Sequence, residues 1–386
     1  MSIRAGARRF FRQGDLLLLI LCSCASACGL VLIASAAAYR GGGRYVLIQG
    51  IAVGIGVAAY ILFTCMDLER LTDRWYWLPV FNVLLLAALA LWGVDGGTGN
   101  RSWLRFSRLP VGIQPAEIVK LTFVLLLARQ MARCQQRGIG RPSAALQLAL
   151  HGLCMCALVL AVSGDAGMAL VYAVIFLLMA FLAGVPLYWF AVLGAGIAAA
   201  AVFLREQIWS RLPDYIRMRL LVVLDHDLDP LNVGWQQARS LLAIGSGQVT
   251  GQGLFHGPLT QSAAESSLPA RHTDFIFAVA GEELGLLGCV AILLLLTAII
   301  LRCVQTGLTA PDSMSALVCM GFAGMLLCQT VLNVAMCLYL APVVGLTLPF
   351  FSYGGSSVVT LFAAMGMVSG VRFRTPGRRL YPAAEW

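Results

Sequence analysis

A small group of ionisable and amide side chains interrupts otherwise apolar stretches of this chain, and such groups in apolar segments are rare and usually functional. Gln114, Glu117 and Lys120 are spaced three residues apart, which stacks side chains on one face of a helix. Lys120 is the only lysine in the sequence. An acid beside a lone lysine is either a structural ion pair between helices or part of a polar cavity, and the isolation of Lys120 favours the cavity.

Two aspartates stand at the ends of apolar runs. Asp165 lies between two such runs, where it is either a turn residue or a member of a polar site. Asp274, in the string His-Thr-Asp-Phe-Ile-Phe, stands where a long polar segment meets the next apolar run. It is either a plain helix N-cap or a carboxylate held at the boundary between water and lipid. Glu282 and Glu283 follow two turns later, and we expect one of them to face the bundle interior.

A stretch rich in glycine and serine, Ser-Tyr-Gly-Gly-Ser-Ser at 352–357, precedes the last apolar run. Exposed backbone N–H groups at such a helix start can bind an anion. The same residues equally suit a tight turn whose serines cap the following helix. The sequence leaves both interpretations open.

The composition indicates which elements hold these residues. Of 386 residues, 60% are hydrophobic and 12% charged, whereas soluble domains average about 45–50% and about 25%. This excludes a soluble enzyme, a disordered protein and a disulfide scaffold. Because each membrane span needs about 20 apolar residues, the sequence predicts an all-α polytopic membrane protein with about ten transmembrane helices. The ten apolar runs are 16–38, 45–66, 75–94, 113–131, 146–162, 168–184, 187–204, 275–301, 316–340 and 356–371.

The arginines predict the orientation of these spans. Fifteen lie near the chain ends or in loops on the same side, and five lie in the short loops opposite. The positive-inside rule therefore predicts that the tails 1–14 and 372–386 are both cytoplasmic. Arginines clustered between apolar runs are typical of topology signals, so the net charge of +9 does not indicate nucleic-acid binding. The first run is too long for a cleavable signal peptide, and cysteines confined to apolar runs and one basic loop predict no structural disulfide.

Two segments on the expected outer side are more than simple connections. Residues 95–112 are glycine-rich and carry three arginines, Arg101 among them, around Trp103. Residues 205–273 form a large extracytoplasmic loop with six arginines and three of the four histidines. Loops of that length without secondary structure are uncommon and usually functional. We therefore expect the chemistry on the extracytoplasmic face of a single membrane domain, 1–386.

Four stretches of the sequence resemble the SEDS proteins (shape, elongation, division and sporulation), the group of RodA, FtsW and SpoVE. The stretches occur in the family order, at 103–120, 229–247, 268–285 and 342–357. The strings His-Thr-Asp-Phe-Ile-Phe and Leu-Pro-Phe-x-Ser-Tyr-Gly-Gly-Ser-Ser are highly specific for this family.

The resemblance implies a ten-helix SEDS-type fold and a peptidoglycan glycosyltransferase. Such an enzyme polymerises lipid II, an undecaprenyl-pyrophosphate-linked donor, into glycan strands at the outer face of the bacterial cytoplasmic membrane, with inversion at the sugar. Its usual partner is a class B penicillin-binding protein that acts as transpeptidase. Two alternatives stay open on the residues alone: a non-catalytic membrane scaffold that activates the transpeptidase, and a lipid II flippase, which buried charges suit equally well. The role in elongation, division or sporulation is not distinguished.

The resemblance also assigns site residues. The family's essential aspartate falls on Asp274, which we expect to be catalytic as a general base or as a ligand of a divalent cation, Mg²⁺ or Mn²⁺. No organic cofactor is expected. The predicted substrate-binding cavity comprises the family positions Glu117, Lys120, Asp165 and Trp103 together with Arg101 and Gln114.

This sequence departs from the family pattern at several neighbouring positions. Ala116 replaces the usual serine, Ala270 replaces a glutamate, and Ser163-Gly164 stands where Gln-Pro is usual. Ala335 and Leu338 replace glycines. These departures bear on substrate preference and activity and add weight to the scaffold alternative, whereas the four intact charged positions favour a working enzyme.

Overall fold

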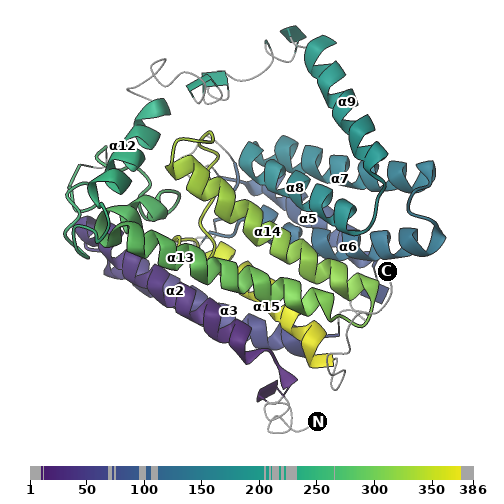
Figure 1. Cartoon of the computed structure of the whole chain (residues 1–386), viewed down its shortest axis with the longest axis horizontal. Coiled ribbons are helices and arrows are strands. Elements are labelled where there is room, and N and C mark those ends of the chain that lie inside the picture. Colours follow the sequence, from purple (N-terminus) through teal and green to yellow (C-terminus); the bar gives the residue numbers. More distant parts are fainter. Residues whose placement is uncertain are drawn as a thin grey trace.

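Each of the ten apolar runs forms a helix in the computed structural model (Figure 1). The structure describes residues 10–374 except 12, 68–71, 74, 95–100, 106–111, 204–205, 208–209, 211–216, 219–220, 223–232 and 265. The ten helices are α2 (Leu16–Ala36), α3 (Gly43–Cys65), α5 (Trp77–Trp92), α6 (Pro115–Arg137), α7 (Pro142–Ser163), α8 (Ala166–Leu182), α9 (Leu187–Phe203), α13 (Ile276–Leu308), α14 (Ser313–Cys337) and α15 (Gly355–Arg374).

The lengths of these helices agree with a multi-pass membrane protein. In the described part of the chain, α2, α3, α7, α13, α14 and α15 are long and apolar enough to cross a membrane. The apolar helices α5, α8 and α9 have 16 or 17 residues. α6 has 23 residues and carries the charged residues discussed above. The all-α fold is therefore confirmed, with ten spans as an approximate count.

Helix starts follow local sequence signals. Pro115 and Pro142 occupy the first turns of α6 and α7, where the missing N–H of proline has no cost. Asp15, Asp165 and Asp312 are N-caps whose side chains accept a backbone N–H of the first turn, at 3.2, 2.9 and 2.8 Å. Such caps satisfy N–H groups that have no partner inside the helix.

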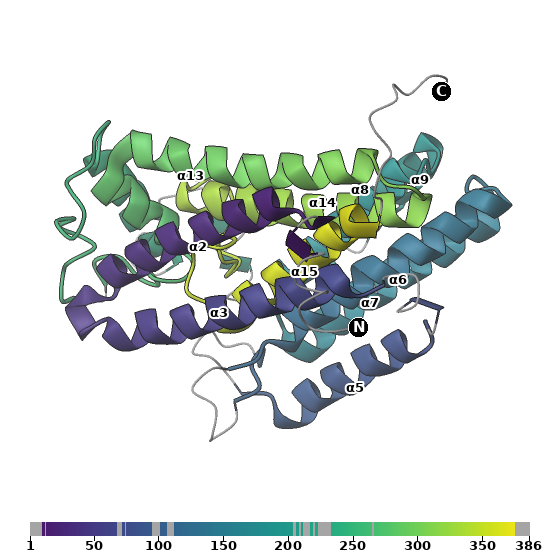
Figure 2. The same ribbon diagram turned by 90° about the horizontal axis from the view of Figure 1, so that it is seen from below.

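The helices run roughly antiparallel, so the bundle has two ends (Figures 1 and 2). We call the end with Ala36 and Ile276 the outer end and the end with Asp15 and Arg374 the inner end, after the orientation expected from the arginines. Helix α14 lies between α13 on one side and α6 and α8 on the other, and α3 packs along α15. A Cβ at Gly366 would lie 2.5 Å from the carbonyl oxygen of Tyr60, so this close approach of α15 to α3 requires glycine.

The predicted long loop 205–273 is not structureless. It contains helix α12 (Val233–Ser246), which packs on α13 and α14. Residues after α12 enter a break in α13 at Gly285, whose φ of 65° lies in the left-handed region. There the N–H groups of Leu286 and Leu287 donate to the carbonyls of Gln248 and Val249 at 2.9 and 3.2 Å. The break therefore joins this segment to the bundle through backbone hydrogen bonds.

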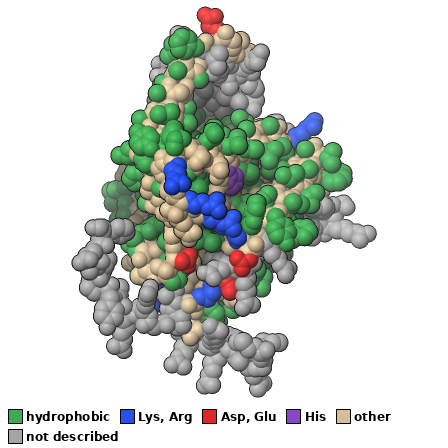
Figure 3. All heavy atoms as spheres, turned by 90° about the vertical axis from the view of Figure 1, so that its right-hand side faces the viewer, with side chains coloured by type: hydrophobic (Ala, Val, Ile, Leu, Met, Phe, Trp, Pro, Cys, Tyr) green, Lys and Arg blue, Asp and Glu red, His purple; other side chains and the backbone are tan. Residues whose placement is uncertain are grey.

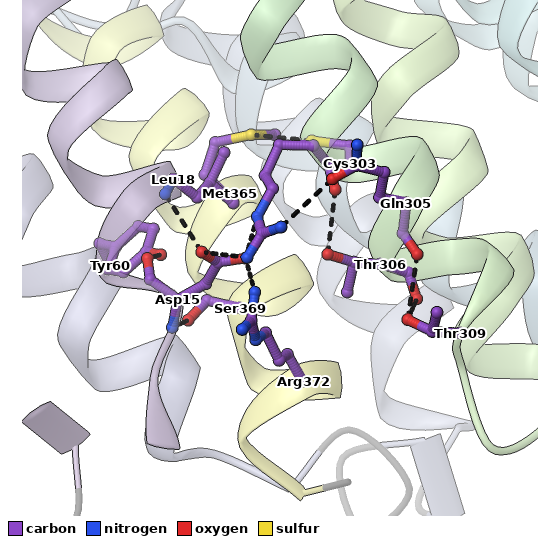
Figure 4. Close-up of polar contacts among 11 residues, drawn as sticks. Asp15, Leu18, Tyr60, Cys303, Gln305, Thr306, Thr309, Met365, Ser369 and Arg372 are labelled. Carbon is purple, nitrogen blue, oxygen red and sulfur yellow. Dashed lines mark hydrogen bonds and ion pairs between the residues drawn. The ribbon is translucent and has the colours of Figure 1, made fainter. Parts of the chain in front are cut away.

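Four helices meet at a buried carboxylate at the inner end (Figure 4). Asp15 accepts from Arg302 of α13 at 2.8 and 3.1 Å, and Arg372 of α15 lies 3.5 Å away. The Tyr60 hydroxyl of α3 donates to the Asp15 carbonyl, and Ser369 Oγ accepts from its N–H. Both arginines count as orientation signals in the sequence, but their pairing with Asp15 is a tertiary feature that no local pattern indicated.

Helix α9 differs from the others because none of its residues is buried. Its start is anchored where Tyr188 and Trp189 donate to the carbonyl of Gly140 at 2.9 and 3.2 Å. Beyond this point it leans away from the bundle (Figure 1). All twelve cysteines are unpaired thiols.

Candidate functional site

A buried ion pair occupies the first turns of α6. Lys120 Nζ lies 2.9 Å from Glu117 Oε2, and the side chains are 1% and 3% exposed. Thr360 Oγ1 of α15 lies 3.4 Å from the same carboxylate oxygen, and Lys120 Nζ lies 4.0 Å from the sulfur of Met168 on α8. The predicted three-residue spacing therefore brings these two charges together, between α8 and α15.

Asp165 belongs to the same charged cluster. It lies in the turn between α7 and α8, buried, and its Oδ1 accepts the Met168 N–H. Burial raises the pKa of the Asp165 carboxyl, and the charge of Glu117 raises it further, while the Met168 hydrogen bond and Lys120 oppose that shift. Asp165 is thus both a turn residue, which here caps α8, and a neighbour of the Glu117–Lys120 pair.

Gln114 immediately precedes α6 and is not part of the helix, although the predicted apolar run began at residue 113. It is the N-cap residue of α6, with extended backbone at φ −100° and ψ 102°. Its backbone N–H donates to Ser356 Oγ of α15 at 3.3 Å. Pro115 follows it as the first residue of the helix, a position where proline is favoured.

Trp103 lies in the connection between α5 and α6, which contains two isolated β-bridges. Trp103 pairs with Val94, and Leu104 pairs with Ile113, each as an antiparallel bridge. Ser102 Oγ donates to the Ser163 carbonyl at 3.4 Å, so this connection contacts the turn that holds Asp165. Trp103 is half-buried and Arg101 is exposed; most of the predicted segment 95–112, including Arg108, lies outside the described residues.

Asp274 is not an N-cap. That position is Phe275, and no side chain caps α13 there. The Asp274 carbonyl accepts the side-chain amide of Asn333 at 2.8 Å, and its half-buried carboxylate faces Gly345, where a Cβ would lie 3.8 Å from Oδ2. The simple capping interpretation of Asp274 is therefore wrong.

Residues 344–345 connect the two aspartates. A Cβ at Gly167, in the first turn of α8, would lie 2.2 Å from the Val344 carbonyl oxygen, so this backbone packs directly on the turn that holds Asp165. The next residue, Gly345, faces the Asp274 carboxylate. The structure thus places Asp274 and the first turn of α8, which Asp165 caps, against the same two-residue stretch.

The two family strings contact each other around Asp274. Ser352 Oγ donates to the Thr273 carbonyl at 2.6 Å and accepts the Leu348 N–H at 2.8 Å. The Tyr353 N–H donates to the His272 carbonyl at 2.9 Å. Asn333, which sequence reasoning missed, also donates to the Leu346 carbonyl. These contacts support the tight-turn interpretation of 352–357, because the Ser352 hydroxyl already makes hydrogen bonds to two backbone groups.

Both Glu282 and Glu283 face the interior, although we expected only one. They are 0% and 1% exposed. Glu282 accepts from the N–H groups of Leu259 and Thr260, both at 2.8 Å, and Glu283 accepts from the side chains of Ser35 and Gln261. Both acids therefore tie the segment before Asp274 to the bundle.

Arg271 completes this support. It is buried, and its guanidinium lies 3.6 Å from the ring centroid of Tyr39. It donates to the carbonyls of Leu259, Thr260 and Ser262. Sequence reasoning missed this role; its one signal is an arginine three residues before the family aspartate.

A divalent cation finds few protein ligands here. In the part of the chain that the structure describes, no three His, Cys, Asp or Glu side chains converge as a metal site. Mg²⁺ commonly binds through one or two carboxylates together with phosphate oxygens of a substrate. Asp274 fits such a role as a single ligand beside substrate phosphate oxygens.

The chain is similar to known proteins along nearly its whole length. The family model FTSW_RODA_SPOVE, described as cell cycle protein, matches residues 15–375. The chain is 34% identical to the peptidoglycan glycosyltransferase MrdB of Escherichia coli (strain K12), across 82% of this chain and 84% of MrdB. It is 30% identical to stage V sporulation protein E of Bacillus subtilis (strain 168), across 92% and 96%.

A solved structure shares the fold. One chain of a peptidoglycan synthase complex that coordinates polymerization and crosslinking is 33% identical to this chain. It superposes with a TM-score of 0.78, covering 93% of this chain and 97% of that one. Sequence and fold agree with the resemblance read from the four stretches, and the chain belongs to the FtsW, RodA and SpoVE family of cell cycle proteins.

Proposed function

We propose that this chain is a peptidoglycan glycosyltransferase that polymerises lipid II into glycan strands at the outer face of the bacterial cytoplasmic membrane. The observation that carries the proposal is the buried charged cluster of Glu117, Lys120 and Asp165, in a chain 34% identical to a protein named peptidoglycan glycosyltransferase. Charges are costly inside an apolar bundle, and inside membrane spans they commonly mark a substrate site.

The reaction joins an acceptor sugar hydroxyl to the anomeric carbon of the donor while the lipid pyrophosphate leaves. Asp274 is our candidate for the general base that takes the hydroxyl proton, and a positioned base typically contributes about 10²–10⁴-fold. Two observations support this role: the Asp274 carboxylate is half-buried beside Gly345, and the Asp274 carbonyl is held by the Asn333 amide. Direct displacement inverts the anomeric centre and needs no covalent enzyme intermediate, unlike the retaining two-carboxylate scheme.

Positive charge near the leaving group stabilises the pyrophosphate as its bond to the sugar breaks. Lys120, held by Glu117, and the arginines around Trp103 are our candidates for this charge. A divalent cation on Asp274 and the pyrophosphate would supply the same stabilisation. Asp165 holds the turn that packs on Val344 and thereby positions the backbone beside Asp274.

The proposed partner is a class B penicillin-binding protein that crosslinks the glycan strand as it grows. The similarity to a chain of a complex that coordinates polymerization and crosslinking supports this partner. The arginine bias supports an orientation with both termini in the cytoplasm, so that the outer end of the bundle faces the lipid II of the outer leaflet.

The test is polymerisation of labelled lipid II by the purified protein together with its partner transpeptidase. Long glycan strands, resolved on a gel and sensitive to a muramidase, are the expected product. A parallel assay measures movement of labelled lipid II across liposomes that contain the protein. Transport without polymer would establish a flippase, and neither activity, with stimulation of the transpeptidase alone, would establish a scaffold; either result would overturn the proposal.

A further inference from the structure

A cavity of about 660 Å³ lies between α5, α6 and α7 at the inner end, away from the charged cluster. Arg129, Arg133 and Arg137 of α6 and Arg141 at the N-cap of α7 all line it, and we call it the arginine pocket. Figure 3 views this end of the molecule and shows basic side chains gathered among apolar ones. The described residues that line the pocket include no carboxylate.

Among the residues that the structure describes, the arginines of this pocket have little charge compensation. Arg129, Arg133 and Arg137 repeat every four residues, so their like charges stand on one helix face and repel one another. Arg129 has an ion-pair partner, Asp73, but at 3.8 Å and with a carboxylate that is 73% exposed, so that pairing is weak. Arg129 Nε is buried without a hydrogen-bond partner. A buried donor of this kind calls for an acceptor.

The pocket is amphipathic from its mouth to its floor. Arg137 and Arg141 lie at the mouth, where α6 ends and α7 begins. Leu126 on α6 and Leu158 on α7 lie deeper, so the pocket follows α6 for about 16 Å, at 1.5 Å per residue. An occupant must therefore carry negative charge at one end and apolar carbon at the other.

We propose that the arginine pocket binds an anionic glycerophospholipid of the cytoplasmic leaflet. The arginines bind the phosphate, and the apolar floor takes the first part of an acyl chain. A lipid suits the pocket better than a soluble anion because the flank of α7 beside it faces lipid: Leu146 and Leu150 are large apolar side chains that are about two-thirds or more exposed. Basic pockets between helices on the cytoplasmic side are a general means of binding lipid headgroups.

This lipid would hold α5, α6 and α7 together at the inner end. Helix α6 carries the Glu117–Lys120 pair in its first turns and the three arginines in its last turns. The lipid site and the charged cluster are therefore two ends of one helix. The lipid proposal does not depend on the reaction that the outer end performs.

Native mass spectrometry of the purified full chain, titrated with dioleoylphosphatidylglycerol or dioleoylphosphatidylcholine, tests the proposal. We expect phosphatidylglycerol to bind at least tenfold more tightly. The double variant R133Q/R137Q should lose at least fivefold of that affinity, since both side chains are exposed and the fold should persist. The control R44Q removes one exposed arginine that lies outside both the pocket and the proposed pyrophosphate site, and it should stay within twofold of the unsubstituted protein.

A second variant and probe separate a lipid from a free phosphate. Leu158→Trp narrows the apolar floor without touching the arginines, and it should weaken phosphatidylglycerol binding by at least threefold. Glycerol 3-phosphate should bind weakly, and with equal affinity, to Leu158→Trp and to the unsubstituted protein. Equal binding of the two lipids, unchanged affinity in R133Q/R137Q, an equal loss in the control, or glycerol 3-phosphate binding as tightly as the lipid would each overturn the proposal.

Discussion

The buried charge of Lys120 is stabilised by its ion-pair partner, Glu117. Its ammonium and the Glu117 carboxylate are both almost fully buried and lie 2.9 Å apart. Removing one member of a buried ion pair leaves an uncompensated charge and typically costs about 3–5 kcal/mol, whereas replacing both members with neutral groups is often close to neutral. A pair of substitutions can therefore separate a structural role of this ion pair from a chemical one.

We predict that Lys120→Met and Glu117→Gln each lower the free energy of unfolding by about 3 kcal/mol, because each leaves its partner buried and unpaired. The double variant should recover most of that loss, to within about 1 kcal/mol of the unsubstituted protein. All three variants should lose polymerisation, because the positive charge near the leaving group is missing or misplaced. Thermal unfolding and the lipid II assay measure the two properties separately. Recovery of polymerisation in the double variant would mean that the pair is structural only.

How much the sequence could predict at this scale depends on whether the contact is local. The Glu117–Lys120 pair follows from a three-residue spacing within one helix, so it was predictable. The helix begins at Pro115 and not at residue 113, and proline, a common first residue of a helix, marked that start in the sequence. The partners of Asp274 could not be predicted, because Asn333 and Gly345 are far away in the sequence.

The start of α8 and the segment 341–354 form the contact between elements that matters most for the site. Gly167 touches the Val344 carbonyl, and Gly345 follows beside Asp274. Neither contact can be read from apolar periodicity, which predicted the helices well but not how their ends meet. For the same reason α12 and the residues that enter the break at Gly285 were expected only as parts of one large loop.

We predict that Gly167→Ala reduces polymerisation at least tenfold with only a modest effect on folding. The new Cβ would lie 2.2 Å from Val344 O and must push residues 344–345, and with them the wall that faces Asp274. Gly194→Ala on α9 is the matched control, since a Cβ there meets nothing within 4 Å. Rates of glycan synthesis normalised to folded protein provide the measurement. Equal activity of the two variants would show that the contact at Gly167 does not position the site.

At the scale of the whole molecule, the bundle separates its polar features between two ends. The outer end holds the charged cluster, Asp274 and the segment tied down by Glu282 and Glu283. The inner end holds the Asp15 ion pairs and the arginine pocket. The bundle between them is mostly apolar, so each end can be altered with little direct effect on the other.

We predict that Asp15→Ala destabilises the whole bundle without changing the turnover of the folded fraction. It removes an N-cap and the partner of Arg302 and Arg372, which should lower the free energy of unfolding by about 3 kcal/mol. Asp312→Ala removes an N-cap alone and should cost about 1 kcal/mol. Thermal unfolding in detergent compares the two variants. A similar small loss in both would show that the ion pairs at Asp15 add nothing to the cap.

Polymerisation of labelled lipid II by Asp274→Asn, with the partner transpeptidase present, tests the central claim most directly. Asparagine keeps the size of the side chain and leaves the backbone contact with Asn333 in place, while it removes the base. We predict a fall of at least 10²-fold in the rate at unchanged thermal stability. The exposed Glu206→Gln serves as control and should retain full activity. Glycan synthesis by Asp274→Asn at the rate of that control would contradict the role assigned to Asp274.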